Sequence, residues 1–351
     1  MITIIEDIPT LEIYREKWNE LLTMAGDFTP FQTFDYVYSA WKIMPPHNGK
    51  LYILCYVCQK DNKLLAICPF YIDTKRTLRF INDIHTDFCD VIVCEESRDD
   101  YHLWEDIFEY IKSDKNILRV ELINIVSDSF LLSFGRYFMI PSVVYCSNAY
   151  SILGIEKQES NANYLRSLQL SNSVDRNRLK KISNKLKDYD FQLFSYPTEF
   201  PKIIVEKIIE KMVDINIRDS SYCDKIIKLV ETLYNNELLS LYFTKIKDEY
   251  VAVNIFLNST KSHHYYNWLV FYEDKKYNLY NLLQSIEYIS KSGGYINFCR
   301  GLYEYKMRNF RPAVYNLYTL RWSKSIWGQI GDLFAMNLYH MKQIVKKIIR
   351  K

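Results

Sequence analysis

The sequence predicts an α+β fold in two halves, each with a central, mixed but mostly antiparallel sheet and flanking helices. The chain has 351 residues, enough for about two domains, and its 48% hydrophobic and 25% charged residues are typical of a folded protein. In each half, adjacent strand-like runs are separated by short polar turns such as "KDN" and "KDE". The same order of helices, strand meander, helix, strand, helix and strand occurs twice, so we expect domains at residues 1–155 and 156–351.

Hydrophobic periodicity assigns the elements of the first half. The helix near its start has apolar residues at helical spacing, and Gly and Pro end it. The expected elements are a strand at Ile2–Ile5, helices at Thr10–Ala25 and Phe31–Met44, strands at Leu51–Gln59, Lys63–Asp73, Thr77–Asn82 and Cys89–Cys94, a helix at Tyr101–Asp114, a strand at Ile117–Val126, a helix at Asp128–Phe138 and a strand at Ser142–Leu153.

The second half repeats this order after a basic helix. Its three adjacent strands are joined by turns, and a Gly-Gly pair ends the helix that follows them. The expected elements are helices at Val174–Tyr189, Pro197–Ile215 and Ser221–Asn236 with a strand at Asp190–Tyr196, strands at Leu238–Lys247, Tyr250–Asn258 and Ser262–Tyr272, a helix at Asn278–Gly293, strands at Tyr295–Cys299 and Val314–Trp322, and a long helix at Ser325–Lys351.

Composition and missing motifs exclude several classes of site. With only nine glycines, the chain has no G-x-G-x-x-G, Walker or G-x-S-x-G motif. Cys55 and Cys58 form a C-x-x-C, but they lie in a strand-like run with no second pair at zinc spacing, so we expect no metal site. A formal net charge of +3 gives no reason to expect a nucleic-acid partner. With no evident export signal and no apolar run long enough to span a bilayer, we expect a cytoplasmic protein, free or at the inner face of the membrane.

Three stretches, "PFQTFDYVYSAWK", "LRFINDIHTDFCDVIV" and "INFCRGLYEYKMRNF", resemble landmarks of the CelD/BcsL-type acetyltransferases, a branch of the GNAT superfamily linked to cellulose and other exopolysaccharides. The order and spacing of the landmarks match over almost the whole chain. The residues that carry the match are Phe31, Gln32, Phe34, Tyr36, Trp41, Asp87, Phe88, Asp90, Phe298, Arg300, Gly301, Tyr305 and Lys306. The resemblance implies two GNAT-like domains in tandem, as in the related Fem-type aminoacyltransferases, and acetyl-CoA or another acyl-CoA as co-substrate of the second.

In GNAT folds two neighbouring parallel strands splay apart, and the pantetheine arm pairs with the exposed strand edge. The resemblance places this edge at Trp268, Leu269, Val270 and Phe271, opposite the strand Tyr295–Cys299. It places the pyrophosphate at the loop 273–278 and the start of the next helix, with Lys275 and Lys276 beside it and Asn278 as the cap. The loop has no glycine, unlike the GNAT pattern, so an ordinary polar turn is the alternative.

The polar cluster after Cys299 would lie at the end of the splayed strand. Tyr305 suits protonation of a leaving thiolate, while Lys306 and Arg300 suit stabilisation of an oxyanion or binding of an anionic acceptor group. Alternatively, Arg300 and Lys306 form ion pairs with Glu304 or Glu287 and the tyrosines edge the core. No side chain stands out as a general base.

Each of three further features has two interpretations. Gln32, Asp87 and Asp90 contact a sugar or amine acceptor, or build a structural turn. The basic helix between Arg176 and Lys187 binds a phosphate-rich ligand or is simply solvated. The basic C-terminal helix contacts an anionic membrane surface or packs on the protein.

The sequence therefore predicts an acyl-CoA-dependent acyltransferase, with acetyl as the expected acyl group, that acts on an amino- or hydroxy-sugar of a surface polysaccharide. A Fem-like aminoacyltransferase and a non-catalytic GNAT-like binding module are the alternatives.

Overall fold

A computed structural model describes residues 1–157, 177, 179–182, 184, 189–216, 220–259 and 263–349 of the chain. The chain forms two compact units, unit 1 (Met1–Asn148 and Asn316–Lys351) and unit 2 (Ala149–Tyr315). Two strands cross the boundary, β7 (Ser142–Ile155) and β13 (Ala313–Ser323). The units thus differ from the expected halves, because residues 316–351 belong to the same unit as residues 1–148.

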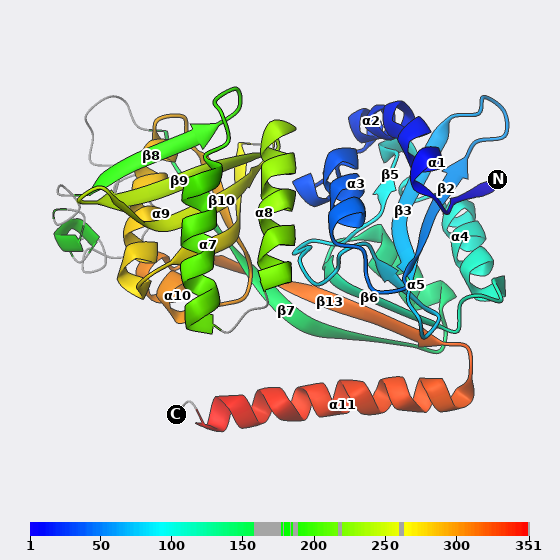
Figure 1. Cartoon of the computed structure of the whole chain (residues 1–351). Coiled ribbons are helices and arrows are strands. Elements are labelled where there is room, and N and C mark those ends of the chain that lie inside the picture. Colours follow the sequence, from blue (N-terminus) through cyan, green and yellow to red (C-terminus); the bar gives the residue numbers. More distant parts are fainter. Residues whose placement is uncertain are drawn as a thin grey trace. The chain divides into compact units, whose positions relative to one another are not determined.

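Unit 1 contains a mixed sheet with the strand order β1-β2-β3-β4-β6-β13-β7, and β5 pairs separately with β3 (Figure 1). All its recorded pairs are antiparallel except β4 with β6. The strands not yet bounded are β1 (Ile2–Ile5), β2 (Lys50–Val57), β3 (Leu64–Ile72), β4 (Thr77–Phe80), β5 (Ile92–Val93) and β6 (Arg119–Val126).

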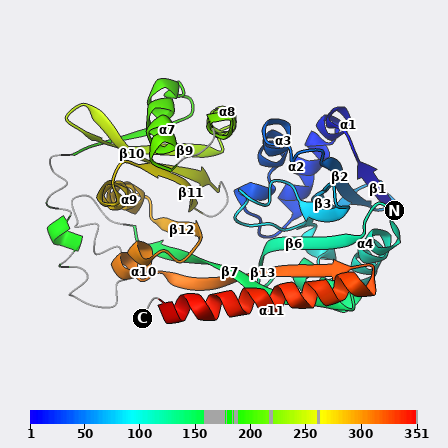
Figure 2. The same cartoon turned by 60° about the horizontal axis from the view of Figure 1, so that its bottom comes forward.

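The helices of unit 1 cover both faces of this sheet. They are α1 (Ile8–Ile13), α2 (Arg15–Met24), α3 (Phe34–Ile43), α4 (Tyr101–Ser113), α5 (Phe130–Phe138) and α11 (Ile326–Ile349), with 3-10 turns η1 (Pro30–Gln32) and η2 (Glu95–Ser97). α4 and α5 enclose a core with alternate residues of β2, β3, β4 and β6, including Trp104 and Phe108. α1, α2 and α3 lie on the other side (Figure 2), where Trp41 contacts Tyr71 with 6.1 Å between ring centroids.

Unit 2 repeats this plan with the strand order β7-β12-β11-β10-β9-β8. Again one recorded pair is parallel, β11 with β12, and the others are antiparallel. The new elements are β8 (Asp190–Ser195), α7 (Lys202–Asn216), α8 (Ser220–Asn235), β9 (Leu239–Ile246), β10 (Glu249–Asn258), β11 (His264–Tyr272), α9 (Lys275–Ser290), β12 (Gly294–Arg300) and α10 (Glu304–Phe310).

In each unit the parallel pair is joined through a helix, α4 in unit 1 and α9 in unit 2, because parallel strands need a crossover connection. α7 and α8 lie on one side of β9–β11 and α9 and α10 on the other (Figure 2). Under α9, side chains such as Tyr242, Phe256 and Leu282 form the core. The predicted α+β class with central mixed sheets is confirmed.

Several expected elements differ in detail, and the following are examples. The helix expected at Thr10–Ala25 is two helices that meet at Tyr14. The strand expected at Cys89–Cys94 is reduced to Ile92–Val93. The helix expected to begin at Asn278 begins at Lys275.

Candidate active site

The parallel strands β11 and β12 separate soon after they begin. Their recorded register covers His264 with Tyr295, Tyr265 with Ile296 and Tyr266 with Asn297, and no later pair joins these two described strands. Beyond Tyr266, β11 remains paired with β10 on its other side up to Tyr272. The edge of β11 at residues 267–272 therefore faces away from its antiparallel partner toward the side that β12 has left.

Both strands are irregular where they part. The pairing of β11 with β10 shifts at Trp268, which is the additional residue of a bulge opposite Ile255 and Phe256. A bulge increases local twist, so it helps to turn the following residues away from β12. The four residues expected to line a donor, Trp268, Leu269, Val270 and Phe271, begin at this bulge.

The pairing of β12 with β7 also shifts, between Asn297 and Arg300. Cys299 has a φ of 58°, and its backbone N–H donates to Asn297 Oδ1 at 2.9 Å. Gly301 follows with a φ of 100°, and its N–H donates to the Ala149 carbonyl at 2.8 Å. This strained turn ends β12 and directs the chain into α10, which carries the predicted catalytic residues.

Tyr305 lies on α10 close to the end of β11 and the first turns of α9. Burial raises the pKa of Tyr305 to about 12, with a smaller contribution from the nearby phenol of Tyr272, while a hydrogen bond with the Asn278 side chain opposes the rise. The phenol therefore remains protonated at neutral pH and can donate a hydrogen bond.

Lys306 points into the protein instead. The side chain is only 4% exposed, and its Nζ donates to the Phe298 carbonyl at 2.7 Å. The ammonium also lies 4.9 Å from the centroid of the Tyr303 ring. Lys306 thus binds the backbone of β12 next to the point where β11 departs. Arg300, the last residue of β12, is half-buried beside Tyr150 of β7.

The start of α9 differs from the expectation. Asp274, not Asn278, caps the helix, and its Oδ1 accepts from the Lys276 N–H at 2.9 Å. The prediction that Asn278 is the cap is therefore wrong, because Asp274 lies four residues earlier and is itself a strong capping residue. The Asp274 carboxylate thus accepts the hydrogen bond of a helix-terminal N–H that the expected pyrophosphate would otherwise accept. Lys275 and Lys276 are exposed beside it.

Sequence reasoning missed a set of buried carboxamides under the first half of α9. Asn254 and Asn267 are 0% and 2% exposed, and neither polar atom of either side chain has a hydrogen-bond partner in the described part of the chain. Strand alternation puts Asn254 on the same face as Phe256, and Asn267 on the same face as Tyr265, and both aromatic rings pack in the core below α9. Asn278, at 3% exposure, also has an Oδ1 without a partner among these residues.

An unpaired buried polar group costs about 1–3 kcal/mol, so such groups generally have a partner such as a bound molecule or water. The carboxamides lie where β11 loses its parallel neighbour and where α9 begins. The only sequence signal for them was an Asn within the otherwise apolar run "YVAVNIFL" and another before "WLVFY".

The three residues predicted to bind an acceptor lie in unit 1. Asp90 and Gln32 border a cavity of about 180 Å³, whereas Asp87, which is 7% exposed, is not among its lining residues. Gln32 is engaged by the backbone, since its Oε1 accepts from the Thr29 N–H at 2.8 Å and its Nε2 donates to the Val91 carbonyl at 3.2 Å.

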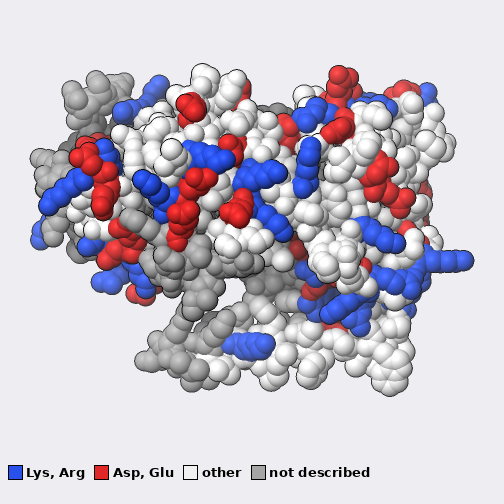
Figure 3. All heavy atoms as spheres, in the orientation of Figure 1, with Lys and Arg blue, Asp and Glu red and all other residues white. Residues whose placement is uncertain are grey.

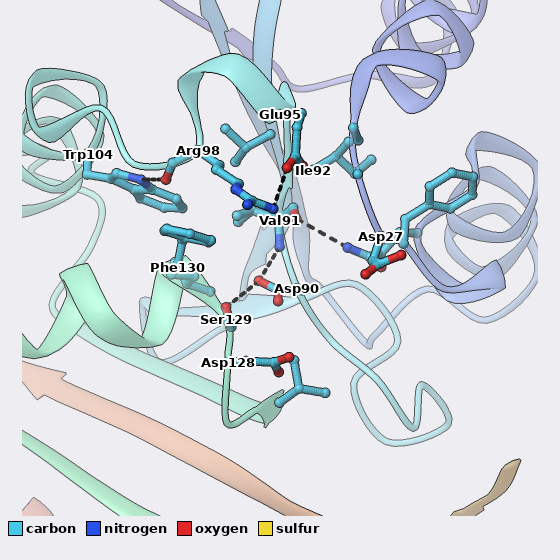
Figure 4. A pocket seen from close by; sticks show the side chains of 17 residues that line it. Asp27, Asp90, Val91, Ile92, Glu95, Arg98, Trp104, Asp128, Ser129 and Phe130 are labelled. Atoms are coloured by element: carbon cyan, nitrogen blue, oxygen red, sulfur yellow. Dashed lines mark hydrogen bonds and ion pairs between the residues drawn. The ribbon is translucent and has the colours of Figure 1, made fainter. Parts of the chain in front are cut away.

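Asp90 has polar partners in this cavity (Figure 4). Its Oδ1 accepts from Ser129 Oγ and from the Val91 N–H, both at 2.8 Å. Burial raises the pKa of Asp90 to about 7, although these two hydrogen bonds oppose the rise. Arg98 and Glu95 form an ion pair of 2.6 Å on another wall.

The basic segment expected to bind phosphate lies mostly outside the described residues. Of its cations, Arg176, Arg178, Lys185 and Lys187 are not described, and only Lys180 and Lys181 are.

The fold is similar to that of several solved proteins. L-PGS from Bacillus licheniformis matches with a TM-score of 0.58 and 13% identity, over 90% of this chain and 94% of that one. A tandem GNAT protein from the clavulanic acid biosynthesis pathway matches with a TM-score of 0.54 and 9% identity, over 93% and 99%. FemX matches with a TM-score of 0.53 and 8% identity, over 87% and 95%. No protein-family model and no curated protein matches the sequence.

One of these structures is a tandem GNAT protein, and the predicted fold of two GNAT-like domains is thereby confirmed. At such low identity the likeness establishes the fold alone. It does not identify the CelD/BcsL branch.

Proposed function

We propose that the protein is an acyltransferase whose acyl donor enters between β11 and β12 of unit 2. The observation that carries this proposal is the parallel pairing that stops after three residue pairs, next to the bulge at Trp268. The edge of β11 at residues 269–271, beyond its last recorded pair with β12, can hydrogen-bond an extended, amide-containing donor as a further strand would. Acyl-CoA is the leading donor, with acetyl-CoA the first to test.

The chemistry needs a nucleophile from the acceptor, stabilisation of the oxyanion and a partner for the leaving thiolate. The acceptor nitrogen or oxygen forms the new bond to the acyl carbon, the carbon–sulfur bond breaks, and the acceptor proton leaves to solvent. With a pKa of about 12, Tyr305 is a weaker acid than a thiol with a reference pKa of about 8.5. Tyr305 therefore acts by hydrogen-bonding the sulfur as charge develops, rather than by giving up its proton.

The other predicted residues receive narrower roles. Lys306 positions the end of β12 through the Phe298 carbonyl, and its charge favours a developing anion nearby. Arg300, Lys275 and Lys276 supply further positive charge, and Asn278 orients the Tyr305 phenol.

The proposed acceptor follows from the sequence landmarks and from a cavity in unit 1. An amino- or hydroxy-sugar of a surface polysaccharide is what the three sequence landmarks imply, and Asp90 and Gln32 border a polar cavity that suits hydroxyl groups. A cytoplasmic location, free or at the inner face of the membrane, is part of this proposal.

A second candidate is an aminoacyl donor. Asn254 and Asn267 present carboxamides that are unpaired within the described residues, and an α-ammonium group can use them where an acetyl methyl cannot. The Asp274 carboxylate at the start of α9 also disfavours a pyrophosphate there.

Titration calorimetry with acetyl-CoA tests the leading donor. We expect micromolar binding to the wild-type protein and to Tyr305→Phe, together with at least tenfold slower transfer by Tyr305→Phe. The exposed Lys291→Ala variant, at the other end of α9, is the matched control and should bind acetyl-CoA as the wild type does. No heat up to millimolar acetyl-CoA would reject acyl-CoA and leave the aminoacyl donor to be tested in the same way.

A further inference from the structure

The last helix, α11, exposes its apolar residues. Its face that points away from the rest of unit 1 is formed by residues three or four apart, with Trp327 79% and Phe334 66% exposed. The exposed apolar residues of α11 are Ile326, Trp327, Ile330, Leu333, Phe334, Leu338, Met341 and Val345. Exposed apolar patches on this scale indicate an interaction surface.

The face of α11 that packs on unit 1 is the polar one. Asp332 Oδ2 accepts from Ser323 Oγ at 2.6 Å, and Gln329 Nε2 donates to the Ser323 carbonyl at 3.1 Å. Farther along, the Tyr339 hydroxyl donates to the Ser147 carbonyl, and its ring contacts Tyr145 at 5.4 Å between centroids. The helix is therefore amphipathic, but its polar side packs on unit 1 through hydrogen bonds and its apolar side is exposed.

The charges of α11 are also one-sided. Asp332 is its single acidic residue between Ile326 and Ile349, and it is buried at 8% exposure. The basic residues gather at the end of the chain: Lys342, Lys346, Lys347, Arg350 and Lys351. Figure 3 shows the described surface of α11, along the lower edge of the view, as largely uncharged, with basic colour only toward its end.

We propose that α11 binds the surface of an anionic lipid bilayer and lies in its plane. An exposed apolar face next to a cationic end complements both acyl chains and anionic headgroups. No helix in the described part of the chain is long and apolar enough to cross a membrane, so the helix lies at the interface. A second copy of the chain fits less well, because two such faces offer no acidic group to the basic ends. This proposal does not depend on the reaction in unit 2.

Flotation with phosphatidylcholine vesicles, with and without about 30% phosphatidylglycerol, tests the proposal, because anionic lipid attracts a basic segment. We expect the full chain to float with the anionic vesicles and at least tenfold less with the neutral ones. Trp327 is also a built-in reporter, because Trp18, Trp104, Trp268 and Trp322 are buried. Its fluorescence should shift to the blue on binding, and Trp327→Phe should lose most of this shift while still floating.

Substitutions test the apolar face and the basic end of α11 separately. Phe334→Glu combined with Ile330→Glu should reduce flotation to background, while Ile13→Glu, at an even more exposed apolar site on α1 (77%), should leave it unchanged. Replacing Lys342, Lys346 and Lys347 by Gln should weaken binding at least tenfold, since each cation near an anionic surface contributes about fivefold. Unchanged flotation of the Phe334 and Ile330 variant would overturn the proposal. The proposal would also be overturned if the wild-type protein binds no vesicles but forms a dimer that the Phe334 and Ile330 variant dissociates.

Discussion

At the scale of single residues, the candidate site consists of buried polar groups. Lys306 donates to a strand carbonyl, Tyr305 is a buried phenol, and the side chains of Asn254 and Asn267 have no partner among the described residues. Polar groups in such places are stable only when they are paired, so they constrain both the fold and what can bind.

Lys306→Met should destabilise the protein. The side-chain stem remains, but the charged hydrogen bond to the Phe298 carbonyl is lost, which should lower the free energy of unfolding by about 1.5–3 kcal/mol. Lys275→Met, at an exposed position on α9, is the control and should change it by less than about 0.5 kcal/mol. Urea melts measure both, and equal stabilities would show that the buried contact contributes nothing.

Asp90→Asn should change how stability depends on pH. The pKa of Asp90 is about 7 in the folded protein, above its unfolded value near 3.8, so folding favours the protonated acid. Its contribution is fully present below about pH 4 and is lost as the pH rises through 7. We therefore expect the free energy of unfolding of Asp90→Asn, relative to that of the wild type, to rise by at least about 1 kcal/mol between about pH 4.5 and pH 8. Urea melts at several pH values measure this difference. A difference that does not vary with pH would contradict the burial of this carboxyl.

At the scale of elements, the connection from β12 to α10 determines where Tyr305 and Lys306 lie. Cys299 and Gly301 both have positive φ, and Asn297 fixes the Cys299 N–H. A Cβ atom on Gly301 would come within 2.8 Å of the Tyr303 ring. The turn thus needs glycine for its backbone angle, and an added Cβ would also displace the Tyr303 ring.

Gly301→Ala should lower the free energy of unfolding by about 1–3 kcal/mol and reduce acyl transfer. The matched control is Gly331→Ala on α11, where a Cβ meets nothing within 4 Å, and helix propensity should raise stability by up to about 1 kcal/mol. Thermal melts of both variants provide the comparison. Tolerance of alanine at residue 301 would show that the turn is not strained.

Most elements could be predicted because their apolar periodicity is clear, as in α4 and β2. The helix break at Tyr14 was not visible, since Leu11, Tyr14 and Trp18 continue the helical spacing across it. The bulge at Trp268 could not be predicted either, because the run Trp268–Phe271 after Asn267 is entirely apolar and shows no alternation that would reveal a shift in register. The positions of Tyr305 and Lys306 after a strand were predicted, whereas the inward direction of Lys306 depends on tertiary packing.

At the scale of the molecule, unit 1 is completed by the end of the chain. β13 pairs with β6 from Leu317 to Ser323, and Leu320 and Trp322 belong to the unit 1 core. Near the boundaries, Thr319 Oγ1 donates to Ser147 Oγ at 2.8 Å in unit 1, and the rings of Tyr150 and Tyr315 stack at 5.2 Å in unit 2. The chain ends of each unit therefore meet in space.

Fragments should follow these units rather than the expected halves. Residues 149–315 alone, and residues 1–148 joined to 316–351 by a short Gly-Ser linker, should each melt cooperatively by circular dichroism. Residues 1–155 alone should not, because they lack the strand that covers β6 and part of the core. A cooperative, monomeric 1–155 fragment would instead support a boundary at 155/156.

The central claim is that the separation of β11 from β12 forms the slot for the acyl donor. A crystal structure of the protein soaked with acetyl-CoA tests it most directly. We expect density along residues 267–271, with the thioester sulfur within hydrogen-bond reach of the Tyr305 hydroxyl. Well-ordered strands with a closed or empty gap at millimolar acetyl-CoA, or density at another site, would contradict it.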